Sequence, residues 1–138
     1  MDYFQWDSSV ETGIIEIDQQ HKRLVEIINE FHAAMVKAKG REVMGDVIRR
    51  LVNYTKYHFA SEEKTMLEVG KFTGYMEHRG LHDKLTKQVE EFQERHATGQ
   101  KVQTMEFLEF LKDWLFKHIK IEDMKYVSCV KGGVENKF

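Results

Sequence analysis

The chain contains no proline among its 138 residues, and this absence limits the folds that it can adopt. Proline removes a backbone N–H and clashes with the preceding turn of a helix, so a chain without it can form long uninterrupted helices. Apolar residues recur at intervals of three and four along most of the sequence, as they do on one face of a helix. We therefore expect an all-α fold.

Capping residues and glycines divide the periodic sequence into four helices. Asp18 is a good N-cap residue, and Gly40, Gly70 and Gly99 follow the first three periodic segments. The predicted elements are an irregular N-terminal leader over residues 1–17, helices over about 19–39, 41–69, 74–97 and 104–127, and a polar tail over 128–138. Four amphipathic helices with short connections are typical of an antiparallel up-down-up-down four-helix bundle. The length suits one domain, so we predict a single domain over residues 1–138.

Charge and composition disfavour several classes of partner. The 21 Lys and Arg nearly balance the 23 Asp and Glu, which gives no electrostatic footprint for nucleic acid or for a membrane surface. The sequence has neither a secretory signal at its start nor a stretch of about 20 apolar residues, so we expect a cytoplasmic protein. Cys129 is the only cysteine, which rules out an internal disulfide and a cysteine-based zinc site, and it carries no functional prediction.

The placement of histidine is unusual. Five of the seven histidines lie on apolar stripes, where a bundle buries its core: His21, His58, His78, His82 and His118. A single core histidine is more often a hydrogen-bonded structural residue than a metal ligand. Burial of the whole set without partners, however, costs about 1–3 kcal/mol for each unsatisfied group. We therefore favour a metal centre over a purely structural role.

Pairs of potential ligands recur at the spacing of one helical turn. His58 and Glu62 are four residues apart, and so are His78 and His82. This spacing corresponds to about 6 Å along a helix and places both side chains on one face. Each pair can therefore address one metal centre.

The last pair of candidate ligands, His118 and Asp123, has a different spacing. They are five residues apart, which leaves them about 140° apart around a regular α-helix. We predict a π-type turn or another local distortion of the helix between them, because it would direct both side chains to one site. In an antiparallel bundle the seven candidates reach one level, whereas His32 and His96 lie about 16 and 21 Å along their helices from His21 and His82.

The order of these residues resembles the ligand pattern of the hemerythrin family. That pattern reads His21, then His58-x3-Glu62, then His78-x3-His82, then His118-x4-Asp123. Further similarity to the bacterial branch of the family comes from Trp6-Asp7, Ile17-Asp18-Gln19-Gln20-His21 and Tyr126. The match covers roughly residues 4 to 127.

The resemblance implies two iron ions with an oxo or hydroxo bridge, and oxygen as a ligand. The implied ligands of one iron are His78, His82 and His118, those of the other are His21 and His58, and the bridging residues are Glu62 and Asp123. The implied function is reversible oxygen binding at a non-haem diiron site, for oxygen storage, delivery or sensing, without enzyme activity. Molecular oxygen would be the main partner, beside an oxygen-using enzyme or a signalling module.

Large apolar residues near the ligands are candidates for the wall of an oxygen pocket. Five of them lie within one turn of a ligand in the sequence: Leu24, Phe59, Trp114, Leu115 and Ile119. Residues of this kind are usually ordinary bundle core. In the functional interpretation, a dry wall keeps water and anions from the open iron and limits proton delivery, which slows autoxidation.

Two other functions share this ligand pattern. A diiron enzyme or redox sensor acting on peroxide or nitric oxide would need proton donors and open access at the metals. A non-redox metal-binding or interaction module would use the bundle surface, but no exposed apolar stripe or basic helix favours it. Five neutral imidazoles and two carboxylates place less negative charge on the metals than the carboxylate-rich ferritin-like sites, so reversible oxygen binding is the leading hypothesis.

Overall fold

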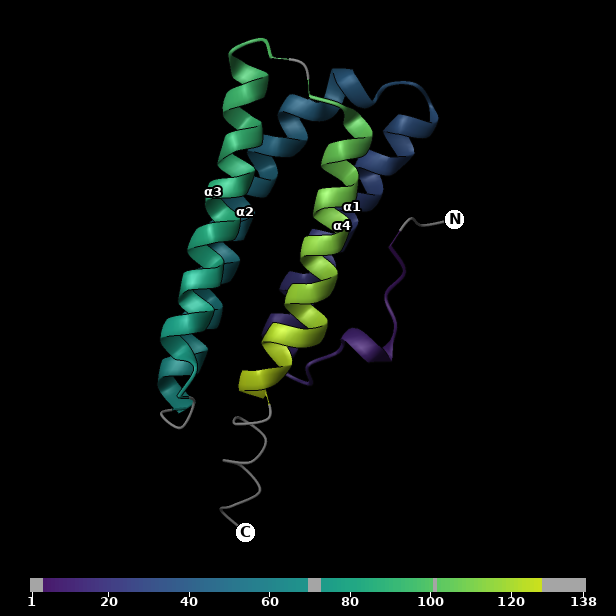
Figure 1. Ribbon diagram of the computed structural model, residues 1–138. Helices are drawn as coiled ribbons and strands as arrows, with labels where there is room; N and C mark the ends of the chain where they lie inside the picture. The colour runs from purple at the N-terminus through teal and green to yellow at the C-terminus, as the bar shows by residue number, and fades with distance from the viewer. Residues whose placement is uncertain (1–3, 70–72, 101, 128–138) are drawn as a thin grey trace.

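The computed structural model describes residues 4–69, 73–100 and 102–127, apart from the side chains of residues 9 and 69. Over these residues the chain forms four α-helices and no strand (Figure 1). The α-helices are α1 (Ile15–Val36), α2 (Gly40–Val69), α3 (Tyr75–Ala97) and α4 (Thr104–Lys117). A short 3-10 helix, η1 (Ser8–Val10), precedes them, and a π-helical segment, η2 (His118–Asp123), extends α4.

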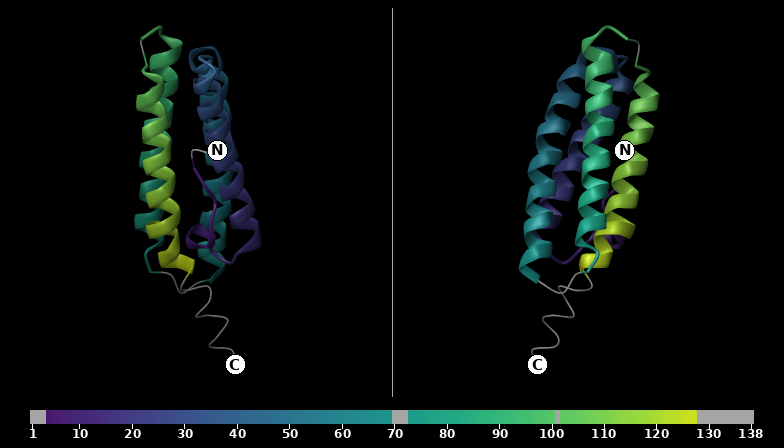
Figure 2. Two further views of the ribbon diagram at one scale, coloured as in Figure 1. Left: turned by 90° about the vertical axis from the view of Figure 1, so that its right-hand side faces the viewer. Right: turned by 60° about the vertical axis from the view of Figure 1, so that its left-hand side comes forward.

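The helices form the predicted up-down-up-down bundle. α1 packs against α2 and α4, and α2 also packs against α3. The helix direction alternates along the chain, so α1 begins at the end of the bundle where η2 lies (Figure 2). The leader runs back along α1, where the Phe4 N–H donates to Asn29 Oδ1 and Asn29 Nδ2 donates to the Phe4 carbonyl. None of the described helices is long and apolar enough to cross a membrane.

The buried histidines and carboxylates gather at one end of the bundle. At the end away from η2, the Phe107 ring lies 5.6 Å from that of Phe31 and 5.0 Å from that of Phe92. Burial of such rings is the main favourable contribution to folding. At the end near η2, histidines and carboxylates are buried among apolar residues such as Phe59 and Ile119. The apolar end can therefore stabilise the fold while the other end carries a site.

The start of α1 differs from the prediction. The helix begins at Ile15, before Asp18, which we predicted to be its N-cap residue. The Asp18 carboxylate instead accepts hydrogen bonds from Thr12 N, Thr12 Oγ1 and Gly13 N, at 2.8, 2.8 and 3.1 Å. Asp18 therefore accepts hydrogen bonds from the leader while it lies inside the first turn of the helix. The helix begins about four residues earlier than predicted.

The end of α1 also differs from the prediction. The helix ends at Val36, not near Lys39, because Ala38 adopts the left-handed conformation with φ 59°. The Lys39 N–H then donates to the Ala34 carbonyl at 2.8 Å, which closes the helix. Gly40 is the first residue of α2, and a Cβ there would lie 2.8 Å from Met35 Cγ. The absence of a side chain at Gly40 therefore allows the end of α1 and the start of α2 to lie close together.

Some of the predicted boundaries lie outside the described residues. These are Gly70, the first two residues of the connection after it, Cys129 and the polar tail over 128–138. The boundary at Gly99 is described, and this residue follows α3 with φ 80°, as a helix-terminating glycine does.

Candidate metal centre

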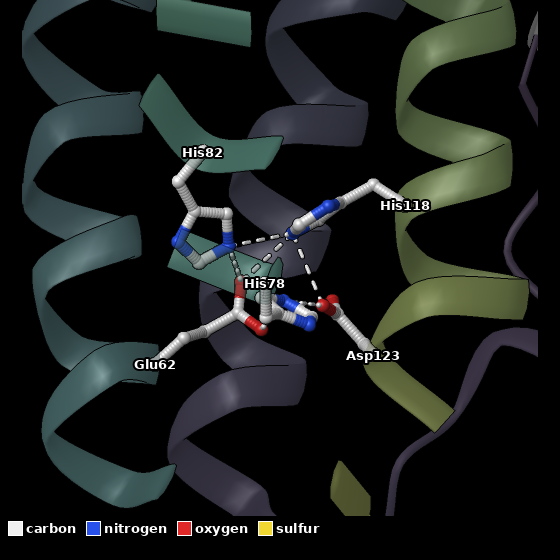
Figure 3. Close-up of side chains that lie close together, drawn as sticks. All are labelled: Glu62, His78, His82, His118 and Asp123. Atoms are coloured by element: carbon white, nitrogen blue, oxygen red, sulfur yellow. Dashed lines mark hydrogen bonds and ion pairs between the residues drawn. The ribbon is translucent and has the colours of Figure 1, made fainter. Parts of the chain in front are cut away.

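Seven buried polar side chains meet at the η2 end of the bundle. They are the seven candidate ligands of the sequence: His21, His58, Glu62, His78, His82, His118 and Asp123. Each is at most 2% exposed. Figure 3 shows five of them pointing toward one another from α2, α3 and η2. The convergence expected from the antiparallel topology is therefore present.

The π-helical segment directs Asp123 into the site. η2 covers His118–Asp123, so the predicted π-type turn is confirmed. A π-helix closes its turn over five residues, so side chains at this spacing lie on the same side. His118 Nε2 accordingly lies 3.0 Å from Asp123 Oδ1.

The ligand atoms form two overlapping groups. The three-histidine group consists of Glu62, Asp123, His78, His82 and His118, and the two-histidine group consists of Glu62, Asp123, His21 and His58. Within each group the ligand atoms lie within 4.8 Å of one another. Because both groups contain the same two carboxylates, the cluster suits two neighbouring ions better than one.

Asp123 divides its two oxygen atoms between the groups. Oδ1 lies 3.0 Å from His78 Nε2 and 3.0 Å from His118 Nε2, in the three-histidine group. Oδ2 lies 3.0 Å from His21 Nε2, in the two-histidine group. A carboxylate arranged in this way can bridge two ions with one oxygen on each.

Glu62 lies between the same groups. Its Oε1 is 2.5 Å from His58 Nε2 and 3.2 Å from His118 Nε2, so it contacts a ring of each group. Its Oε2 is on the side of His78, at 3.9 Å from Nε2. Both carboxylates therefore occupy positions between the two sets of imidazoles.

The outer hydrogen bonds of two imidazoles turn their lone pairs toward the cluster. His82 Nδ1 lies 3.1 Å from Glu63 Oε2, and His58 Nδ1 lies 2.7 Å from Gln20 Oε1. Carboxylate and amide oxygens accept hydrogen bonds, so each Nδ1 carries the proton and each Nε2 carries a lone pair. The lone pair of His58 then faces a carboxylate oxygen of Glu62. This contact is repulsive unless a cation lies between the two atoms.

The spacing of the ligand atoms fits metal coordination. Nitrogen ligands bind transition metals at about 2.0–2.1 Å, so neighbouring ligands at right angles lie about 3 Å apart. The distances from His82 Nε2 to His118 Nε2 and from His118 Nε2 to Asp123 Oδ1 are 3.2 and 3.0 Å. Among the described residues, His21 Nε2, His58 Nε2 and both Asp123 oxygens have no hydrogen-bond partner. The cluster therefore fits metal ions, and imidazole with carboxylate suits transition metals.

Burial keeps the imidazoles in the form that binds metals. It lowers the pKa of His78 to about 4 and that of His82 to about 2, and the nearby His118 acts in the same direction. Burial also lowers the pKa of His58. These rings are therefore neutral at neutral pH, which leaves a nitrogen lone pair on each for a metal.

The two carboxylates have opposite pKa shifts. Burial by itself would raise the pKa of Glu62, but His58 and His118 hold it well below its usual range. Burial and the neighbouring Glu62 raise the pKa of Asp123 well above its usual range. The protein groups alone thus favour one ionised carboxylate, and a pair of cations would ionise both.

The five candidates for the pocket wall are all buried and belong to the apolar core that runs through the bundle. Phe59 stacks on His82, with ring centroids 3.9 Å apart and planes 7° apart. Trp114 lies nearly parallel to His118, with centroids 6.1 Å apart. The aromatic pair therefore covers rings of the three-histidine group, and the fully buried aliphatic residues are Leu24, Leu115 and Ile119.

Three residues of the site had no predicted role of their own: Gln20, Glu63 and Tyr126. Gln20 could have been found, because it is a polar residue on the apolar stripe of α1. Tyr126 is 1% exposed, and its ring lies 5.5 Å from that of His78. Glu63 gives no such signal, because the packing of α2 on α3 decides which residue faces His82. His96 lies away from the cluster, as expected, where a Cβ at Gly45 would come within 2.8 Å of its ring.

Comparison with known proteins gives one consistent result. The family model described as hemerythrin HHE cation binding domain matches residues 12–130. A bacteriohemerythrin of Pseudomonas aeruginosa is 37% identical over 131 residues, which cover 95% of this chain and 84% of that protein. A hemerythrin-like protein of Naegleria gruberi is 32% identical, with 89% and 90% covered. The structure of a wild-type hemerythrin has a TM-score of 0.83 at 27% identity, with 93% of this chain and 98% of that chain covered.

The depressed histidine pKa values predict that the metal-free protein loses stability in acid. The unfolded chain protonates histidine at about pH 6.5, whereas folded His78 and His82 do so near pH 4 and 2. Below about pH 6 the unfolded state therefore binds more protons, and the free energy of unfolding falls by up to about 1.4 kcal/mol per pH unit for each histidine. Above about pH 7 the contribution is constant.

Urea denaturation of chelator-treated protein at neutral and mildly acidic pH measures this effect. The double variant His78→Gln with His82→Gln is the matched control, because it lacks both groups. Its free energy of unfolding should depend less on pH than that of the wild type. Equal pH dependence of the two proteins would contradict the role given to these histidines.

Proposed function

Because the chain belongs to the hemerythrin family, we propose that it binds molecular oxygen reversibly at a pair of iron ions in this cluster. The observation that carries the proposal is the unequal division of five buried imidazoles around two shared, buried carboxylates. Storage, delivery and sensing of oxygen all begin with this binding step.

We propose that all seven cluster residues are iron ligands. One iron would be held by His78, His82 and His118, the other by His21 and His58, with Glu62 and Asp123 as bridges. The division of the Asp123 oxygens between the two groups supports this assignment. The two-histidine group offers one ligand fewer, so a position for oxygen is expected on its iron.

The iron pair would supply the two electrons that oxygen accepts on binding and would recover them when oxygen leaves. For reversible binding, the surrounding protein groups have to favour return of these electrons to the iron over their permanent transfer to oxygen. Five imidazoles contribute no negative charge, so highly oxidised iron is stabilised less than in carboxylate-rich sites. This charge balance favours an oxygen carrier over an oxidising enzyme.

The apolar residues around the ligands would protect the bound state. Leu24 lies one turn after His21, and Leu115 and Ile119 flank His118; all three are fully buried. Such side chains exclude water and anions and offer no proton. On the two-histidine side, the partner of the outer nitrogen of His58, Nδ1, is the amide of Gln20, which does not ionise. We therefore propose that this wall slows autoxidation.

An oxygenation cycle tests the proposed function. Reduced protein carrying two irons per chain is exposed to air and then returned to oxygen-free buffer while its visible spectrum is recorded. We expect a charge-transfer band that appears with oxygen and disappears on its removal over repeated cycles. Rapid irreversible oxidation in the first cycle would contradict carriage and favour the enzyme or sensor hypothesis.

Replacement of Glu62 by alanine tests the bridge. We expect Glu62→Ala to lower iron affinity by more than tenfold, since loss of even an outer partner of a ligand typically costs 10–100-fold. The magnetic coupling of any remaining iron pair should also weaken. Glu68→Ala, an exposed change on the same helix, is the control. Two irons per chain with unchanged coupling in Glu62→Ala would refute the assignment.

Polar replacements test the wall of the pocket. We expect Leu115→Gln or Ile119→Gln to speed autoxidation on the order of tenfold, equivalent to about 1.4 kcal/mol of barrier, while iron content stays the same. Leu108→Gln is the matched control, because Leu108 is as fully buried as Leu115 but lies about 10 Å closer to the start of α4, away from the site. Stopped-flow spectra give the rates. If the Leu115 and Leu108 variants behave alike, the wall residues are ordinary core.

A further inference from the structure

Glu63 holds the outer face of a ligand histidine. It follows Glu62 on α2, but a step of one residue turns its side chain about 100° around the helix, toward α3. Its Oε2 lies 3.1 Å from His82 Nδ1, and its side chain is 22% exposed. Its Oε1 lies 3.6 Å from Arg79 Nε; burial raises the pKa of Glu63, and this guanidinium acts in the opposite direction.

The His82 ring is fixed on two sides. The Glu63 carboxylate accepts the Nδ1 hydrogen, so Nε2 faces the cluster with its lone pair. Phe59 stacks on the face of the same ring, which restricts its rotation. Carboxylate, imidazole and metal site thus form one chain, an arrangement that raises the basicity of a ligating histidine.

The other group has a neutral partner at the equivalent place. His58 Nδ1 lies 2.7 Å from Gln20 Oε1, and both side chains are buried. An amide orients the ring as a carboxylate does, but it adds no charge. The structure therefore places a negative charge behind a ligand of the three-histidine group and a neutral dipole behind a ligand of the two-histidine group.

We propose that Glu63 is a positioning residue that strengthens His82 as a metal donor and lowers the reduction potential of the metal pair from the side of the three-histidine group. This inference rests on the proposed iron pair. A negative charge close to a metal stabilises its more positive oxidation state. Gln20 places no such charge behind His58, so Glu63 biases the pair toward giving electrons to oxygen without adding a further charge on the oxygen-binding side.

A purely structural role for Glu63 makes different predictions. In that case its contacts with Arg79 and His82 are ordinary partly exposed polar contacts, and the ion pair contributes about 0–1 kcal/mol to stability. Loss of either partner of the ion pair would then have similar small effects on stability and none on the metal.

The decisive variants change charge but preserve shape. Glu63→Gln keeps an oxygen that can accept the His82 Nδ1 hydrogen and removes the negative charge. Arg79→Gln removes the positive charge that offsets Glu63 and leaves the Glu63–His82 contact in place. Glu68→Gln, on the exposed side of α2, is the control for removal of a carboxylate from this helix.

We expect the two variants to differ in reduction potential, measured by spectroelectrochemical titration of the iron-loaded proteins. Glu63→Gln should raise the potential, and Arg79→Gln should lower it or leave it unchanged. A tenfold change in the preference for ferric over ferrous iron corresponds to about 59 mV for one electron. A potential of Glu63→Gln equal to that of Glu68→Gln would overturn the proposal, and so would a rise in Arg79→Gln.

Binding of Co²⁺ to the metal-free proteins gives a second readout that does not depend on oxygen. We expect Glu63→Gln to weaken Co²⁺ binding at least tenfold, with an unchanged thermal midpoint of the metal-free protein. Unchanged Co²⁺ affinity would refute the donor effect, even if the wild type failed to bind oxygen reversibly. Conversely, shifts of affinity and potential in a protein that fails the oxygenation cycle would uphold the role of Glu63 and reject the proposed function.

Discussion

Burial of imidazoles and carboxylates away from water is the constraint on which the rest of this structure depends. Each polar group left unsatisfied in a core costs about 1–3 kcal/mol, and this core buries seven imidazole and carboxylate side chains within two overlapping groups. Cations between the lone pairs satisfy the groups together, so binding of metal and stability of this end of the bundle are coupled. The opposite end, packed around Phe107, carries no such cost.

The backbone of each helix is adapted to this constraint. Regular α-helix suffices in α2 and α3, because side chains four residues apart already lie on the same face. After α4 the spacing is five, and the backbone changes to a π-helix so that Asp123 can reach both groups. Of the three residue pairs, only His118 and Asp123 therefore need a departure from regular helix geometry. This departure brings the Asp123 carboxylate between the two groups.

The site is asymmetric at three levels. The histidines divide three and two, Phe59 and Trp114 cover rings of the larger group, and Glu63 places a charge on that side. The smaller group has a neutral amide partner in Gln20. The larger group therefore has more imidazoles, aromatic cover and a charged outer partner, whereas the smaller group has one imidazole fewer and a neutral outer partner, as the proposed oxygen position on that side requires.

The sequence by itself determined the four helices, the polarity of their faces and the convergence of the seven buried residues. These follow from spacings within single helices and from antiparallel order, which are local properties. Even the departure from regular helix after α4 could be predicted, because residues five apart lie about 140° apart around a regular α-helix. Only the tertiary structure decided that Asp18 caps the leader, that Phe59 stacks on His82 and that Glu63 contacts the same ring. These contacts depend on the rotation and translation of one segment against another, which no spacing within a single helix specifies.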